Sequence, residues 1–227
     1  MKRKVNQLGK KMKKLTIAAV TIVILITLMA VILLEMNNAQ FQTPIKVACV
    51  GDSLTEGSGY PEYLWMRLGA NYTVENFGYP GAAISNKSHA PYIIEDEFEK
   101  AKAFQPNIII IMLGTNDALP KFMGSNSTFI ADYKTLIQEF KNIPTTPKIW
   151  IAKPPPIFHN GTGLSTETFD NKVIPSIQQV ATETQLPIID VYSALITHPE
   201  YFGDGVHVNA EGAKTIANQI YNAIVST

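Results

Sequence analysis

Cysteine is almost missing from this chain, which has one thiol, Cys49, in 227 residues. A single cysteine excludes an internal disulfide framework and any zinc or iron–sulfur site made of several cysteines. Histidine is also scarce, with four residues, and around His89, His159 and His198 no acidic residues stand at the spacing of zinc ligands. We therefore expect no metal centre. Glycine and proline, at 14 residues each, are too few for a collagen-like or low-complexity chain.

Charge is also limited, at 17% of the residues, and its two signs are unevenly distributed. Seven of the 19 basic residues precede residue 15, where there is no acidic residue. From Glu35 onward 12 basic residues face all 19 acidic residues, which gives this part a formal charge of −7. An acidic surface disfavours nucleic acid as the main partner.

The first third of the chain contains a long apolar run, Leu15–Leu34, without charge, glycine or proline. Twenty residues in a helix span about 30 Å, the thickness of the hydrocarbon layer of a membrane. The basic residues 1–14 are predicted to form a cytoplasmic tail, which places the rest of the chain outside. The run is longer than the apolar core of a usual signal peptide, so we predict an uncleaved signal anchor at 15–34. A cleaved signal peptide and a secreted product are the alternative.

Residues 35–44 form a short polar linker that is expected to have no regular structure of its own, and residues 45–227 alternate between short apolar strands and amphipathic helices. One domain is expected, because a single core suits this length. The pattern predicts strands at 45–50, 72–76, 107–113, 148–152 and 186–191, and helices at 61–68, 93–104, 127–141, 170–184 and 209–225. Strands that alternate with helices imply an α/β fold whose parallel sheet is covered on both faces.

Polar residues and glycines follow four of the predicted strands, at 51–54, 76–81, 114–117 and 203–209. Functional groups in such a sheet collect just beyond the carboxyl ends of the strands. The four segments are therefore expected to share one edge. Each alone is an ordinary turn or helix cap, and only their joint placement favours a catalytic site.

The side chains in these segments suit nucleophilic catalysis. Ser53 needs a base, and His207 is the one histidine with a carboxylate three residues earlier, Asp204. Asp204 can hold Nδ1–H of His207 and leave Nε2 for Ser53. The backbone N–H groups of Ser53 and Gly81 and the side-chain amide of Asn116 are candidate oxyanion donors.

Two further acids, Asp52 and Asp117, flank these candidates. We predict a structural role for both, as acceptors for backbone N–H groups in the loops. The aromatic residues Tyr79 and Phe122, also close to the candidate residues in sequence, are predicted to line a substrate pocket.

In chain order, the segments resemble the GDSL or SGNH hydrolase family. The matching residues are Gly51–Leu54, Gly81, Gly114–Asp117 and the Asp204–His207 pair, and the likeness covers about residues 46–226. It implies a flavodoxin-like three-layer α/β/α sandwich with a five-stranded parallel sheet. It also implies esterase chemistry with Ser53, Gly81, Asn116 and His207 as signature residues and Asp204 as the third triad member.

A narrower likeness extends to bacterial carbohydrate O-acetylesterases of this superfamily, including sialate and xylan deacetylases. It is carried by Asn76–Gly81, Lys153–Pro156 and His198–Phe202, while Ala118–Phe122 departs from the expected pattern.

We thus predict a serine esterase that hydrolyses short acyl esters, chiefly acetyl groups on sugars, through an acyl-enzyme on Ser53. Its substrate is a small acyl ester or an acylated glycan, and no metal or organic cofactor is required. An acyltransferase to a glycan hydroxyl and a lipase or lysophospholipase remain alternatives. A non-catalytic glycan-binding protein is disfavoured by the complete set of groups.

Overall fold

The structure is a computed structural model that describes residues 2–39, 43–159 and 161–226. The chain divides into two units, Met1–Thr43 and Pro44–Thr227. The first contains the helix α1 (Lys2–Ala39), in which Gln7–Leu34 is long and apolar enough to cross a membrane by length and composition.

The helix α1 is longer than the predicted anchor. No glycine or proline interrupts the chain between residue 10 and Pro44, so the helix continues through residues 35–39 of the predicted linker. That part of the linker was predicted to lack regular structure, and this is corrected. Residues 40–42 of the linker lie outside the described residues.

The second unit is built on a parallel sheet with the strand order β2-β1-β3-β4-β5. Its strands are β1 (Ile45–Gly51), β2 (Tyr72–Gly78), β3 (Ile108–Met112), β4 (Lys148–Lys153) and β5 (Ile188–Asp190). The chain leaves β1 toward β2 on one side and later returns to β3 on the other. In sheets of this type ligands bind at such a reversal, just beyond the carboxyl ends of the two strands, which here are β1 and β3.

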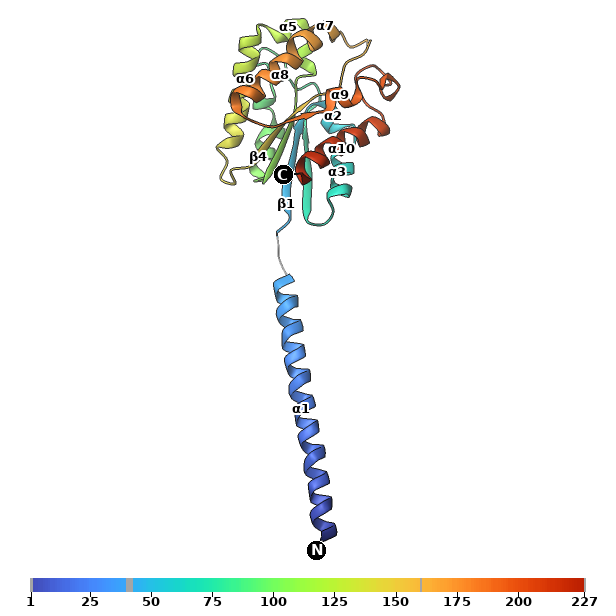
Figure 1. The fold of residues 1–227 in the computed structure, drawn as a ribbon. Helices are drawn as coiled ribbons and strands as arrows, with labels where there is room; N and C mark the ends of the chain where they lie inside the picture. Colours follow the sequence, from blue (N-terminus) through green and yellow to red (C-terminus); the bar gives the residue numbers. More distant parts are fainter. Residues whose placement is uncertain (1, 40–42, 160, 227) are drawn as a thin grey trace. The chain divides into compact units, whose positions relative to one another are not determined.

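Helices cover both faces of the sheet (Figure 1). One face carries α3 (Tyr60–Leu68), α9 (Val191–Leu195) and α10 (Ala210–Val225). The other carries α4 (Asp96–Ala103), α6 (Asn126–Lys141) and α8 (Ile174–Thr184). The predicted three-layer α/β/α sandwich with five parallel strands is confirmed.

Residues of β1 contribute to the hydrophobic cores on both faces of the sheet. Val47 and Cys49 pack into the core beneath α3 and α10, whereas Ala48 and Val50 pack into the core on the opposite face. All four are fully buried. Successive side chains of a strand point to opposite faces, so a strand covered on both sides is apolar throughout.

Short helical turns make up much of the remaining structure, and those other than the turns at 92–94 and 169–173 lie outside the predicted helices. They are α2 (Ser53–Glu56), η1 (Tyr92–Ile94), η2 (Asn116–Ala118), α5 (Pro120–Met123), α7 (Thr166–Thr168), η3 (Phe169–Val173) and η4 (Pro199–Tyr201).

Two predicted helices differ from the structure in detail. The helix predicted at 93–104 is interrupted because Glu95 has extended backbone, which separates η1 from α4. The helix predicted at 170–184 begins with the π-helical turn η3, and Pro175 lies in the first turn of α8. Proline is tolerated there because the first helical N–H groups need no partner within the helix.

Candidate active site

Ser53 is the first residue of α2, directly after the carboxyl end of β1. The preceding residue, Asp52, caps this turn, since its Oδ1 accepts a hydrogen bond from the amide of Leu54 at 2.9 Å. Gly51 and Gly78 pair across β1 and β2, and any side chain at Gly78 would collide with the backbone of Asp52. The turn that carries Ser53 therefore packs against the end of the neighbouring strand.

Three of the predicted residues form a continuous hydrogen-bonded chain. Ser53 Oγ lies 2.9 Å from His207 Nε2, and His207 Nδ1 lies 2.7 Å from Asp204 Oδ2. Asp204 Oδ1 also accepts hydrogen bonds from the amides of Val206 and His207, at 2.9 and 2.7 Å. Partial desolvation acts to raise the pKa of Asp204, but the hydrogen bonds from the His207 ring and these amides outweigh it and lower the pKa to about 2. Asp204 is thus a carboxylate at neutral pH.

The loop that contains Asp204 and His207 is held in place by contacts with Phe158, which lies outside it. The amide of Phe158 donates to the carbonyl of Gly205 at 2.8 Å, and the ring of Phe158 meets that of Phe202 with centroids 4.9 Å apart. Phe202 in turn forms an isolated bridge with Val208. These contacts position the loop over the sheet edge independently of Ser53.

The candidate oxyanion donors lie on two linked segments. Gly81 follows β2 and has φ +81°, a left-handed conformation that favours glycine. Asn116 follows β3, and its Nδ2 donates one proton to the carbonyl of Ala82 at 2.9 Å. An amide nitrogen carries two protons, so this bond orients the Asn116 side chain and leaves a second donor.

The two flanking acids are fully buried beneath these segments. Asp117 accepts hydrogen bonds from the amides of Ile84 and Ser85, at 2.9 and 2.8 Å, and Asp52 caps α2 as described. Their predicted structural role is confirmed. Burial raises the pKa of Asp117 to about 7 and that of Asp52 to about 6, against the lowering effect of these hydrogen bonds.

The predicted pocket residues take different positions. Tyr79 is half-buried, and the charge of Glu95 raises its pKa. Phe122 is only 4% exposed, and its ring contacts His89 with centroids 5.1 Å apart. The side chain of His89 is exposed, whereas the Phe122 ring that it contacts is buried. His89 was not predicted from the sequence as a candidate site residue, because its spacing from other residues gives no sign of a functional role.

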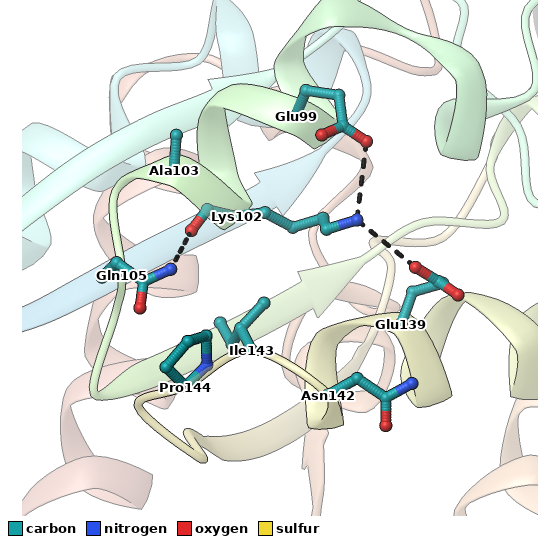
Figure 2. Close-up of a pocket in the computed structure, with 8 residues that line it drawn as sticks. All are labelled: Glu99, Lys102, Ala103, Gln105, Glu139, Asn142, Ile143 and Pro144. Carbon is teal, nitrogen blue, oxygen red and sulfur yellow. Dashed lines mark hydrogen bonds and ion pairs between the residues drawn. The ribbon is translucent and has the colours of Figure 1, made fainter.

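A separate hollow of about 370 Å³ lies between the ends of α4 and α6 (Figure 2). Its Lys102 Nζ lies 3.5 Å from Glu99 Oε1 and 3.3 Å from Glu139 Oε2, so the ammonium group is paired with both carboxylates. Gln105 and Pro144, which precede β3 and β4, place it at the amino edge of the sheet, opposite Ser53. Within the described ranges, no group of three or more His, Cys, Asp or Glu side chains could hold a metal ion.

Comparison with known proteins identifies the family to which this chain belongs. Residues 49–215 match the model of the GDSL-like lipase/acylhydrolase family. An acetylxylan esterase from Xylanibacter ruminicola is 32% identical over an alignment of 206 positions that covers 79% of this chain. The chain spans 43% of that relative, less than half of its length.

Solved structures share the fold. A carbohydrate acetylesterase family member from Sinorhizobium meliloti superposes with a TM-score of 0.62 at 23% identity, covering 80% of this chain and 98% of the other. The native aryl esterase of M. smegmatis superposes with a TM-score of 0.65 at 19% identity, covering 80% and 99%.

Proposed function

Because the chain belongs to the GDSL-like lipase/acylhydrolase family, we propose that it is a serine esterase that removes short acyl groups, chiefly acetyl, from carbohydrates. The observation that carries this proposal is the chain of hydrogen bonds from Ser53 through His207 to Asp204, at 2.9 and 2.7 Å. This arrangement provides a nucleophile, a base and a group that orients the base.

The proposed reaction begins when Ser53 Oγ attacks the acyl carbon and its proton passes to His207 Nε2. Asp204 stabilises the resulting imidazolium through Nδ1–H. The carbonyl oxygen becomes an oxyanion, which the N–H groups of Ser53 and Gly81 and the second amide proton of Asn116 stabilise.

The tetrahedral intermediate then collapses. The C–O bond to the alcohol breaks, His207 Nε2 returns its proton to the departing oxygen, and an acyl-enzyme remains on Ser53. A water molecule attacks this ester while His207 Nε2 takes its proton. In the second collapse the C–O bond to Ser53 breaks, His207 Nε2 gives its proton to Ser53 Oγ, and the acid is released. Neither a metal ion nor an organic cofactor takes part in these steps.

The acetyl and carbohydrate preference rests on relatives. The similar protein from Xylanibacter ruminicola is named an acetylxylan esterase, and one protein of the same fold is a carbohydrate acetylesterase family member. We further propose that α1 anchors the chain in a membrane with the second unit outside, since basic residues precede the apolar run. An acylated glycan outside the cell is then a natural substrate.

An ester panel tests the proposal on the full chain in detergent. Acetyl, butyryl and long-chain esters are compared with acetylated sugars, using Ser53→Ala and, as a matched control, the exposed Ser127→Ala. We expect acetyl esters to react fastest and Ser53→Ala to lower kcat by about 10⁴-fold or more, with Ser127→Ala unchanged. A serine-directed phosphonate should label Ser53. Full activity in Ser53→Ala would refute the proposal, and a preference for long chains would indicate a lipase.

A further inference from the structure

A short loop, residues 84–90, closes beside the proposed oxyanion donor Gly81. Its two ends are joined, since the amide of Ala83 donates to Ala90 O and the amide of Tyr92 donates to Ala83 O, both at 2.9 Å. Near the end of this loop, His89 Nε2 lies 3.7 Å from the point where a Cβ on Gly81 would be. The imidazole therefore borders the place where the substrate carbonyl would bind.

The ring of His89 rests on a buried support. Phe122, in α5, is 4% exposed and meets His89 at an interplanar angle of 58°. On the same aromatic ring lies Lys121, whose Nζ is 4.8 Å from the centroid of Phe122. An exposed imidazole and an ammonium group thus share one aromatic ring beside Gly81.

Two lysines without an ion-pair partner among the described residues lie in this loop and in α5. Lys121, and Lys87 in the loop, form no ion pair with any residue that the structure describes. The chain from Glu35 onward nevertheless carries a formal charge of −7. Tyr79 has an acidic neighbour instead, Glu95. Lys121 thus lies near His89 and Glu95 lies near Tyr79, while Asp132, which accepts two hydrogen bonds from Asn86, adds one negative charge beside the loop.

An acetyl group offers only one methyl to an enzyme, so polar side chains at the rim meet the alcohol part of the ester. We propose that His89 and Lys121 form a subsite for the sugar part of the substrate that favours a sugar carrying a carboxylate. His89 Nε2 would donate a hydrogen bond to the sugar, and Lys121 would supply the positive charge. This inference rests on the proposed esterase function.

The test compares kcat/KM for two substrates that differ in one group, an acetylated methyl glucoside and the acetylated methyl glucuronide, with phenyl acetate as an ester without a sugar. The full chain is assayed as wild type, Lys121→Met, Lys121→Arg and His89→Ala. Lys148→Met is the matched control, because Lys148 is exposed at the amino end of β4, at the opposite edge of the sheet, and forms no ion pair with the described residues.

We expect the wild type to prefer the glucuronide, and Lys121→Met to lower the glucuronide-to-glucoside ratio by about 2–5-fold, as expected for one exposed charge. Lys121→Arg should retain the ratio, and 0.5 M salt should reduce it in the wild type. His89→Ala should lower kcat/KM for both sugars by roughly tenfold relative to phenyl acetate. Lys148→Met should match the wild type throughout.

A wild-type ratio near one, unaffected by salt and by Lys121→Met, would overturn this inference while Ser53-dependent hydrolysis of phenyl acetate leaves the esterase function standing. If none of the three esters shows hydrolysis that depends on Ser53, the proposed function fails and the subsite fails with it.

Discussion

Asp117→Asn is the change that tests most directly how the site is held together. In the wild type, burial raises the pKa of Asp117 from 3.8 to about 7. A carboxyl group whose pKa is higher in the folded than in the unfolded chain stabilises the fold fully at a pH below its pKa in the unfolded chain. This stabilisation is lost as the pH rises through its pKa in the folded chain. Between pH 5 and pH 8 the free energy of unfolding should therefore fall, by roughly 2–3 kcal/mol from Asp117 alone.

The side-chain amide introduced by Asp117→Asn cannot titrate, so this part of the pH dependence should disappear in the variant. The replacement has a constant cost as well, because the new NH₂ group faces one of the two amides, of Ile84 or Ser85, that Asp117 accepts from. An unsatisfied buried donor costs about 1–3 kcal/mol. The variant should thus be less stable than the wild type at pH 5, and the two should converge toward pH 8.

Urea denaturation of the full chain in detergent, followed by tryptophan fluorescence at pH 5, 6, 7 and 8, measures this difference. Asp52→Asn is the companion variant, since the pKa of Asp52 is raised less, to about 6, and its removal should flatten the curve less. Parallel curves for the wild type and Asp117→Asn would show that Asp117 does not titrate in this range and would refute the reasoning.

Three other outcomes follow from the geometry. Asn116→Ala should lower kcat on acetyl esters by about 10²–10³-fold, as for the loss of one oxyanion donor, and a rate within threefold of the wild type would exclude that role. Gly78→Ala should destabilise the chain by more than about 3 kcal/mol, because the new methyl collides with the backbone of Asp52 and Glu56; a thermal unfolding curve that superposes on that of the wild type would contradict this. If α1 is an anchor, the mature protein should sediment with membranes and keep residues 1–34 by N-terminal sequencing, whereas a soluble product that begins after Leu34 would indicate a cleaved signal peptide.

The three layers of the fold, and the edge of the sheet that carries the candidate site, could be predicted because they depend on local sequence patterns. A strand such as β3 is apolar at every position, and a parallel strand covered by helices on both faces has that composition. All parallel strands end at the same edge, so residues that follow them, such as Ser53 and Asn116, gather without any knowledge of the loops. The pairing of Ser53 with His207, 154 residues apart, needed only that rule and the triad chemistry.

The loops could not be predicted in the same way. Helices of one turn, such as α2 and α5, are too short to show a helical period, and the break at Glu95 leaves the amphipathic pattern of that region unchanged. His89 lies beside Gly81 in a loop whose start is held by Asp117, on another strand connection, and whose ends are joined by backbone hydrogen bonds. Such a contact depends on tertiary hydrogen bonds that leave no periodic signal in the sequence.

Because the loop 84–90 is held through backbone groups, its side chains can change independently of the residues proposed for catalysis. Asp117 accepts hydrogen bonds from the amides of Ile84 and Ser85, and Asn116 donates to the carbonyl of Ala82, so both recognise backbone groups. Because backbone groups are the same for every residue except proline, side chains farther along the loop can change without moving Gly81. Substitutions at His89, or in the unusual segment 118–122 that supplies its support, can therefore alter which ester binds while the hydrogen-bonded chain from Ser53 to Asp204 keeps its geometry.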